Sequence, residues 1–145
     1  VLRTTVIVGY PGESDKQFQE LLDFIKWAKF DALGCFPFFA EIDTVAALLP
    51  NQIPDEIKNQ RVDQLMGLQL TIIFEKMDAQ IGRDLTVLVD EVHDKHAIGR
   101  YYGQAPHIDS VCKIANCTVH TGRFITARIT GRDGYDFLVK QLGSK

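Results

Sequence analysis

The chain has 145 residues, of which 46% are apolar and 24% charged, as in an ordinary globular protein. No apolar run reaches the roughly 18 residues that a membrane span needs, so we expect no membrane partner. The net charge of −3 combines −5 over residues 1–80 with +2 over residues 81–145, and neither part has the dense positive charge of a dedicated nucleic-acid-binding protein. Three cysteines form an odd, sparse set, which argues against a disulfide framework and favours a reducing, cytoplasmic location.

The first predicted element is a β-strand that leads through a glycine turn into a helix. Val6–Val8 form a short β-branched run, which is typical of a strand covered on both faces. A Pro-Gly pair ends the run, and Ser14 with Gln17 matches a capping box at the start of a helix that extends to about Lys29. One strand–helix unit cannot bury both of its faces, so we expect this chain to be the C-terminal piece of a larger α/β protein.

A second strand and a long helix follow. Residues 32–39 predict a strand, residues 40–53 a connector, and residues 54–80 a helix with Gly67 at its centre. Two apolar stripes run along this helix: Val62, Met66, Leu70, Ile73, Met77 and Ile81 on one, and Leu65, Leu68 and Ile72 on the other. A helix with two apolar faces contacts two bodies, so we interpret it as a connector between domains.

From residue 81 onward, apolar residues alternate with polar ones at a period of two. The alternation recurs at residues 85–89, 125–129 and 135–139, and glycines separate the runs. Several short strands with glycine turns in about 60 residues predict a five-stranded, OB-like β-barrel. The expected fold class is therefore α/β followed by an all-β domain.

Five blocks, in order along the chain, resemble the radical-SAM methylthiotransferases. Residues 6–13 are similar to the late-barrel strand and loop of that family, and residues 33–38 to the next strand. The block at residues 61–66 resembles the segment that leads to the family's C-terminal TRAM domain. Residues 99–111 and 129–137 are similar to segments that are typical of the RimO type.

The resemblance implies both an architecture and an activity. It makes residues 1–53 the end of a TIM-type radical-SAM barrel, residues 54–80 a connecting helix and residues 81–145 a TRAM domain. RimO-type enzymes methylthiolate an aspartate of a small-subunit ribosomal protein, with S-adenosylmethionine and two 4Fe-4S clusters. The implied partner is that ribosomal protein. The charge of only +2 over residues 81–145 predicts weak binding to RNA besides. The alternatives are a MiaB-type enzyme, which modifies adenosine in tRNA, and a non-catalytic RNA- or ribosome-binding module.

The sequence also departs from the family. The three-cysteine motif that ligates the radical-SAM cluster is absent, and only Glu41 and Thr44 match the Glu-Gly-Thr step that follows the second strand. Cys112 and Cys117, both expected on strands, have the spacing of neither a zinc site nor a cluster site. We therefore predict no metal ligand and no catalytic residue in this chain, which by itself should be inactive.

Gly9, Pro11, Gly12 and Glu13 are the candidate cofactor-binding residues. They form a loop after a predicted barrel strand, where barrel enzymes build their sites, and glycines allow a ligand to approach the backbone closely. The resemblance places S-adenosylmethionine near this loop. The alternative is a tight strand-to-helix turn in which Glu13 serves only the start of the helix.

Arg100, Tyr101 and Tyr102 are the candidate partner-binding residues. A guanidinium beside two aromatic rings is a frequent contact set for proteins and for RNA. The alternative is ordinary strand packing, with one ring inside the barrel and the other outside.

Overall fold

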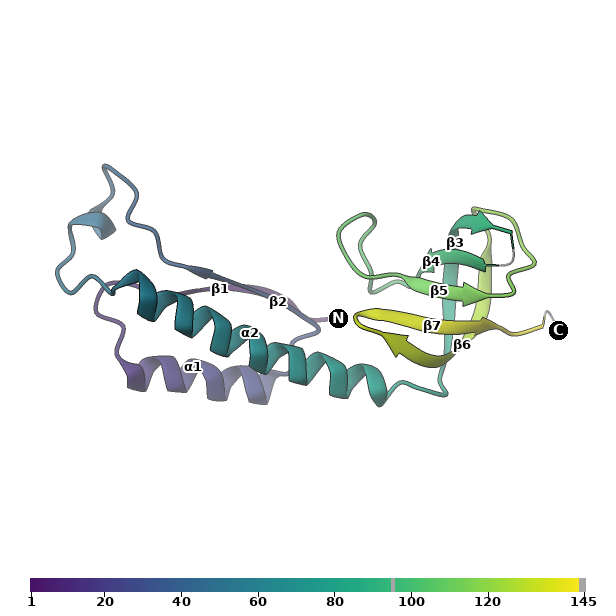
Figure 1. Cartoon of the computed structure of the whole chain (residues 1–145), viewed down its shortest axis with the longest axis horizontal. Helices are drawn as coiled ribbons and strands as arrows, with labels where there is room; N and C mark the ends of the chain where they lie inside the picture. The colour runs from purple at the N-terminus through teal and green to yellow at the C-terminus, as the bar shows by residue number, and fades with distance from the viewer. Residues whose placement is uncertain (95, 144–145) are drawn as a thin grey trace. The chain divides into compact units, whose positions relative to one another are not determined.

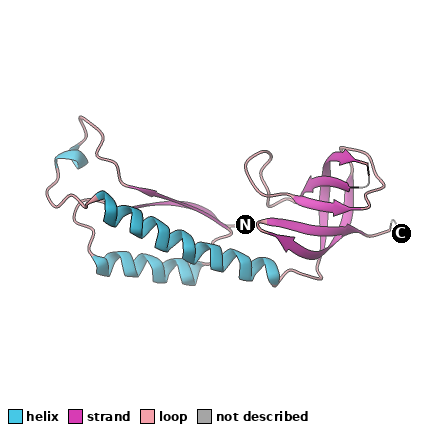
Figure 2. Cartoon of the chain, in the orientation of Figure 1, coloured by secondary structure: helices cyan, strands magenta, loops and turns pink. Residues whose placement is uncertain are grey.

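The computed structural model describes residues 1–94 and 96–143, and the chain divides into two compact units. The first unit comprises Val1–Ile73 and the second Phe74–Lys145. Helices and strands alternate in the first unit, whereas strands dominate the second (Figure 2). None of the helices in the described residues combines the length and the hydrophobicity that a membrane span requires.

The first unit contains a two-stranded parallel sheet and helical segments. In chain order (Figure 1), its elements are β1 (Arg3–Val8), α1 (Asp15–Ala28), β2 (Ala32–Pro37), the short 3-10 helix η1 (Val45–Leu48) and α2 (Asp55–Asp78), which continues into the second unit. Arg3 lies opposite Ala32, and Val8 lies opposite Pro37. The predicted strand–helix–strand order is therefore present, with two parallel strands of the predicted α/β part.

The start of α1 has the predicted capping box. The Ser14 N–H donates to Oε1 of Gln17 (2.9 Å), and the Gln17 N–H donates to Oγ of Ser14 (3.3 Å). Lys29 ends the helix in a left-handed conformation, with φ of 49°. These local interactions fix where the chain leaves the 9–13 loop and enters the helix.

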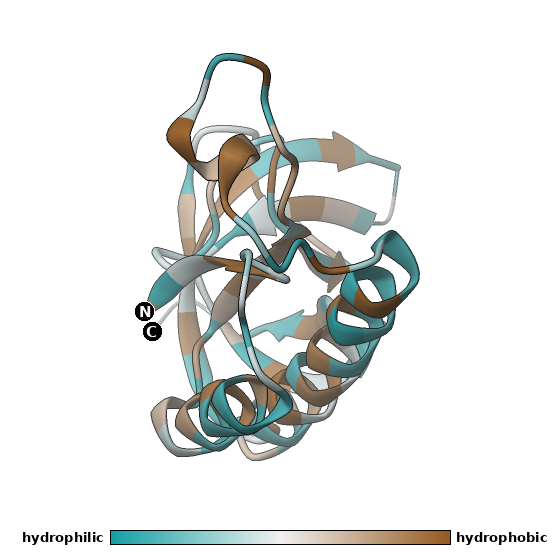
Figure 3. Ribbon diagram, turned by 90° about the vertical axis from the view of Figure 1, so that its left-hand side faces the viewer, coloured by the Kyte–Doolittle hydropathy of each residue, from teal (hydrophilic) through white to brown (hydrophobic). Residues whose placement is uncertain are grey.

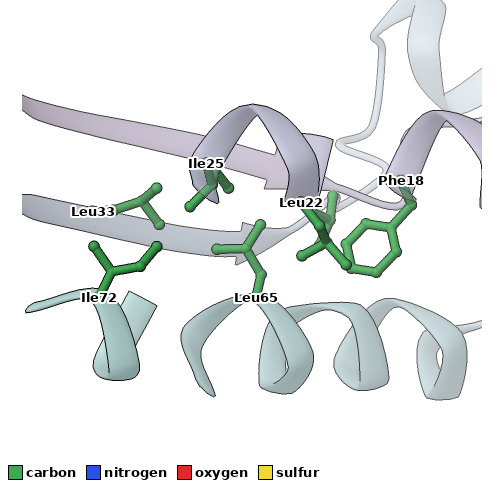
Figure 4. Packing of buried hydrophobic residues seen from close by; sticks show 7 residues of the cluster. Phe18, Leu22, Ile25, Leu33, Leu65 and Ile72 are labelled. Carbon is green, nitrogen blue, oxygen red and sulfur yellow. The ribbon is translucent and has the colours of Figure 1, made fainter. Parts of the chain in front are cut away.

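The core of the first unit lies between one face of the sheet and the two helices. Figure 4 shows side chains of α1, β2 and α2 that point toward one another. The buried members of this cluster are Val8, Phe18, Leu22, Ile25, Leu33, Leu65 and Ile72. Ile7 and Phe36 point away from this core and are exposed. Within the first unit, the helices therefore cover one face of this sheet, whereas parallel sheets usually have both faces covered.

The face of α2 that packs in the first unit is partly polar. Its buried residues, spaced three or four apart, are Lys58, Arg61, Leu65, Gln69 and Ile72. The predicted stripe through Leu70 and Ile81 is wrong at these two positions, because both are exposed. Apolar periodicity misses a face of this kind, since long polar side chains bury their hydrocarbon stems as apolar ones do.

The loop that carries η1 exposes several apolar residues. Figure 3 shows hydrophobic colouring in this loop, where Phe39, Ile42, Val45 and Leu48 are largely exposed. The side-chain amide of Gln52 donates to three carbonyl groups of residues 46–49, so the loop has its own hydrogen bonds.

The second unit contains the predicted five-stranded barrel. Its strands are β3 (Asp84–His93), β4 (His96–Arg100), β5 (Cys112–Ala115), β6 (Phe124–Asp133) and β7 (Asp136–Gln141). They close in the order β3-β4-β5-β7-β6, with β5 and β7 parallel and the other pairs antiparallel. This five-stranded closed arrangement is consistent with an OB-like barrel.

Apolar side chains at alternate positions of the strands fill the barrel interior. The buried side chains are Val87, Val89, Ala97, Cys112, Ile114, Ile125, Ala127, Ile129, Phe137 and Val139. The register shifts between Val89 and Glu91 and again between Ile129 and Gly131. Such bulges bend strands and allow a small sheet to close on itself.

The last turn of α2 packs against the barrel within the second unit. The guanidinium of Arg132 lies 4.0 Å from the ring centroid of Phe74. The Nε atom of Arg132 lies 2.7 Å from Oδ1 of Asp78. The ring centroids of Phe74 and Tyr135 are 5.4 Å apart, and Met77 is buried. These contacts join the end of the helix to the β6–β7 hairpin. The predicted domain boundaries after residues 53 and 80 stay predictions.

Candidate functional site

The four candidate cofactor-binding residues lie together in the 9–13 loop, between β1 and α1. Gly9 and Gly12 have φ of 76° and 83°, in the left-handed region that side chains rarely tolerate. Both positions therefore require glycine for the turn itself, whatever the loop binds.

Most backbone N–H groups of the 9–13 loop already donate within the chain. The Gly9 N–H donates to Oε1 of Glu13 (3.1 Å), and the Glu13 N–H donates to a carbonyl within the loop (2.9 Å). The Gly12 N–H donates to the carbonyl of Asn51 (2.9 Å). A ligand at this loop would therefore meet carbonyl oxygens and the open flank of Gly12, where an added Cβ would find nothing within 4 Å.

The Glu13 carboxylate connects the loop to α2. Besides accepting from Gly9, its Oε1 atom lies 2.6 Å from NH1 of Arg61, which also donates to the Glu13 carbonyl (3.3 Å). The NH2 group of Arg61 lies 2.7 Å from Oδ1 of Asp15, and the guanidinium lies 5.3 Å from the ring centroid of Phe18. The side chains of Arg61 and Glu13 are only 7% and 15% exposed. This shielded, charge-assisted contact fixes the orientation of Glu13.

Lys58 covers Gly9 from α2. A Cβ added to Gly9 would collide with the Lys58 side chain, whose Cδ and Cβ atoms would lie 3.2 and 3.3 Å away. The Nζ atom of Lys58 lies 2.9 Å from Oδ1 of Asp55 and 5.8 Å from the ring centroid of Phe38. On the side that faces α2, the space beside Gly9 is occupied by the Lys58 side chain and is closed to a ligand.

Sequence reasoning missed Lys58 and Arg61 as parts of this region. Their spacing of three residues places both on one helical face, which also carries Leu65. The sequence offered one indication that these two cations are buried: they share a helical face with Leu65, a core residue. The pairing itself could not be found locally, since Arg61 and Glu13 are 48 positions apart.

The candidate partner-binding residues lie at the end of β4 and just beyond it, in different surroundings. Arg100 pairs with Asp90 on β3. The half-buried Tyr101 ring lies 6.1 Å from Phe137, centroid to centroid. Tyr102 is 90% exposed, and its ring meets that of Tyr101 edge to face. Of these three side chains, Tyr102 is the one that presents an aromatic ring to solvent.

The loop after β4 is held in place from inside. Buried Gln104 accepts from the Tyr101 N–H (3.1 Å) and donates to Oγ of Ser110 (3.1 Å). The Ala105 N–H donates to Oδ2 of Asp109 (2.6 Å). Tyr102 and Ile108 are therefore exposed on a loop that has its own hydrogen bonds.

Several cations on the barrel surface are paired with carboxylates. The pairs are Arg100 with Asp90, Lys113 with Asp133 and Asp136, Arg128 with Asp84, and Arg132 with Asp78. Hydrogen bonds to Arg128 and Lys113 lower the pKa of Asp84 and of Asp133, and the same bonds raise the pKa of both cations. Cations that already neutralise carboxylates contribute less to the attraction of phosphates.

The cysteines are not arranged for a metal centre. Cys35 and Cys112 lie on β2 and β5, but Cys117 lies in the loop after β5, so the expectation of a strand was wrong there. Burial raises the pKa of Cys35 to about 11 and that of Cys112 to about 12. Within the described residues, no three His, Cys, Asp or Glu side chains gather closely enough to hold a metal ion. Three cysteines that do not gather in one place do not fit an iron–sulfur cluster, which is held by several cysteine ligands at once.

Comparison with known proteins matches residues 81–141 to the TRAM domain family. The chain is also similar to curated proteins named ribosomal protein uS12 methylthiotransferase RimO. The identity is 44% to that of Pasteurella multocida and 43% to that of Histophilus somni, both over 138 residues, and 41% to that of Pectobacterium atrosepticum over 136 residues. Each alignment covers 93% of this chain and 31% of the relative.

The chain thus spans about a third of the length of the curated relatives that it matches. Its barrel unit corresponds to the matched TRAM region, and the similarity to RimO proteins extends through the first unit as well. The predicted resemblance is confirmed: by sequence, this chain is a relative of the RimO-type methylthiotransferases that carries a TRAM domain.

Proposed function

We propose that this chain is part of a RimO-type methylthiotransferase that modifies an aspartate of a small-subunit ribosomal protein. The observation that carries the proposal is the similarity to proteins of that name over nearly the whole chain. The parallel strands with helices on one face, followed by a TRAM barrel, support it. A cytoplasmic location, where ribosomes assemble, fits this substrate.

In the proposed enzyme, S-adenosylmethionine and two 4Fe-4S clusters supply the radical chemistry. The described residues of this chain do not fit a cluster, so we place both clusters on another part of the enzyme. The 9–13 loop is the proposed neighbour of S-adenosylmethionine, through its carbonyl groups and the open flank of Gly12. The chain would thus complete the radical-SAM barrel and carry the domain that binds the target.

The target of the barrel unit is proposed to be protein rather than RNA. Arg100, Lys113, Arg128 and Arg132 are engaged by carboxylates, which weakens the phosphate attraction on which RNA binding depends. Tyr102 is exposed on a loop with internal hydrogen bonds, and an exposed aromatic ring of this kind is a typical anchor for a protein partner. Arg100 pairs with Asp90 on β3 and so does not offer an unpaired charge to a partner.

Mass spectrometry tests the activity. The complete gene product that carries this sequence should be expressed in a bacterium whose own uS12 methylthiotransferase gene has been deleted. We expect one methylthio group on an aspartate of a small-subunit ribosomal protein. Methylthioadenosine in tRNA instead would favour the MiaB-type alternative, and no methylthio product on either target would favour a binding module.

A salt titration tests the partner. We expect tRNA binding to the chain to vanish at physiological salt. Proteins that depend on six to ten phosphate contacts lose about a thousandfold or more in affinity between low and moderate salt. Binding to the small-subunit ribosomal protein should persist and should weaken in Tyr102→Ala. Phe124→Ala, at another exposed aromatic residue of the barrel, is the matched control. Tight tRNA binding at physiological salt, without binding of the ribosomal protein, would contradict the proposal.

A further inference from the structure

We propose that Arg61 is a positioning residue for the cofactor loop. Its guanidinium holds the Glu13 carboxylate at the place where that carboxylate accepts the Gly9 N–H, and so determines the shape of the 9–13 loop. The inference rests on the proposed function, which places S-adenosylmethionine at this loop. Arg61 would act through Glu13 and would not touch the cofactor itself.

The burial of the pair supports this role. The Arg61 side chain is buried and that of Glu13 is largely shielded, whereas Asp15, the second carboxylate on Arg61, is fully exposed. A shielded carboxylate that loses its cation carries an uncompensated charge, so Glu13 would turn toward water. The Gly9 N–H would then lose its acceptor, and the loop would lose the contact between its first and last residues.

The geometry requires arginine rather than any cation. NH1 reaches both Oε1 and the carbonyl of Glu13, while NH2 reaches Asp15. A planar fork serves these separate oxygens at once, whereas a lysine ammonium lacks that fixed arrangement of donors. Arg61→Lys should therefore hold the Glu13 carboxylate in part. Arg61→Met, which keeps an apolar stem against Phe18, should not hold it at all.

Hydrogen exchange of single amides in this chain is the first test. In Arg61→Met, the Gly9 N–H should exchange about 10- to 100-fold faster, as expected when a charged hydrogen bond is lost, with Arg61→Lys in between. The Ile25 N–H in the core of the first unit should not change. Arg128→Met, which removes another forked arginine pair in the second unit, should leave Gly9 unaffected.

Two outcomes of this experiment would overturn the proposal. One is an unchanged Gly9 rate in Arg61→Met. The other is equal acceleration of Gly9 and Ile25, because that pattern means that Arg61 only stabilises the unit as a whole.

Equilibrium binding of S-adenosylmethionine to the complete, cluster-loaded gene product is the second test. We expect Arg61→Met to raise the Kd about tenfold or more, with Arg61→Lys between that variant and the unchanged protein. Equal affinity for S-adenosylmethionine in the unchanged protein and in both variants would overturn the role of Arg61 and leave the proposed function intact. If the unchanged protein binds no S-adenosylmethionine, the proposed function fails, and with it the role of Arg61 toward the cofactor.

Discussion

Replacing Gly99 with alanine should destabilise the barrel strongly, and the structure indicates by how much. Gly99 is buried on β4, opposite Val89 of β3 and Cys112 of β5. An added Cβ would collide with the carbonyl oxygen of Leu88 and would lie 2.8 Å from Cγ1 of Val87. The Val87 side chain is itself fully buried, and the carbonyl belongs to a paired strand and cannot move without disturbing the barrel.

Overpacking of this kind costs about 1–3 kcal/mol, and we expect about 3 kcal/mol because the obstacle is backbone. A unit of this size has a total stability of about 4–10 kcal/mol, so the loss is a large share of it. Gly67→Ala is the matched control in α2, since its added Cβ meets nothing within 4 Å and alanine is favoured in helices by about 1 kcal/mol.

Hydrogen exchange measured in increasing urea reports both changes separately. The amides of Ile114 and Val139 follow the barrel, and that of Ile25 follows the first unit. In Gly99→Ala, the barrel amides should open at much lower urea while Ile25 stays unchanged. A barrel that remains as stable as in the unchanged chain would refute the packing argument.

Three further predictions concern charge, helix docking and thiol chemistry. Asp84 and Asp133 have a folded pKa below the unfolded value of about 4, so their stabilising contribution is complete above that pH and is lost as the pH falls through the folded pKa. Thermal melts between about pH 5 and pH 2 should show this loss in the unchanged chain and a smaller one in Asp84→Asn. Arg132→Gln should lower the free energy of unfolding of the second unit by about 1–2 kcal/mol in urea titrations, because it removes the contacts with Phe74 and Asp78, whereas Arg123→Gln should not. At pH 8, a disulfide reagent should modify Cys112 far more slowly in the folded chain than in urea, since burial holds the thiol protonated; rapid modification of the folded chain would contradict this.

Local patterns in the sequence were sufficient for the elements themselves. The Ser14–Gln17 capping box depends on residues three positions apart, so the start of α1 was predictable. The alternation in the C-terminal part likewise indicated short strands, because a barrel strand must turn every second side chain inward. The motifs of the RimO type were readable for the same reason, as each is a contiguous block.

Tertiary contacts decided which residues serve the 9–13 loop and which surface of the barrel is available. Apolar periodicity pointed to Leu70 as part of a packed stripe of α2, whereas the buried face includes Lys58 and Arg61. Arg61 is buried because Glu13 and the ring of Phe18, both from a distant segment, compensate its charge. Lys58 pairs with Asp55 in its own helix and lies near the ring of Phe38 from the segment after β2. The exposure of Tyr102 likewise depends on the hydrogen bonds within its loop. Asp90 on β3 pairs with Arg100 on the neighbouring strand β4. Charge compensation between segments far apart in the chain leaves no periodic pattern in the sequence, so the folded structure was needed to find it.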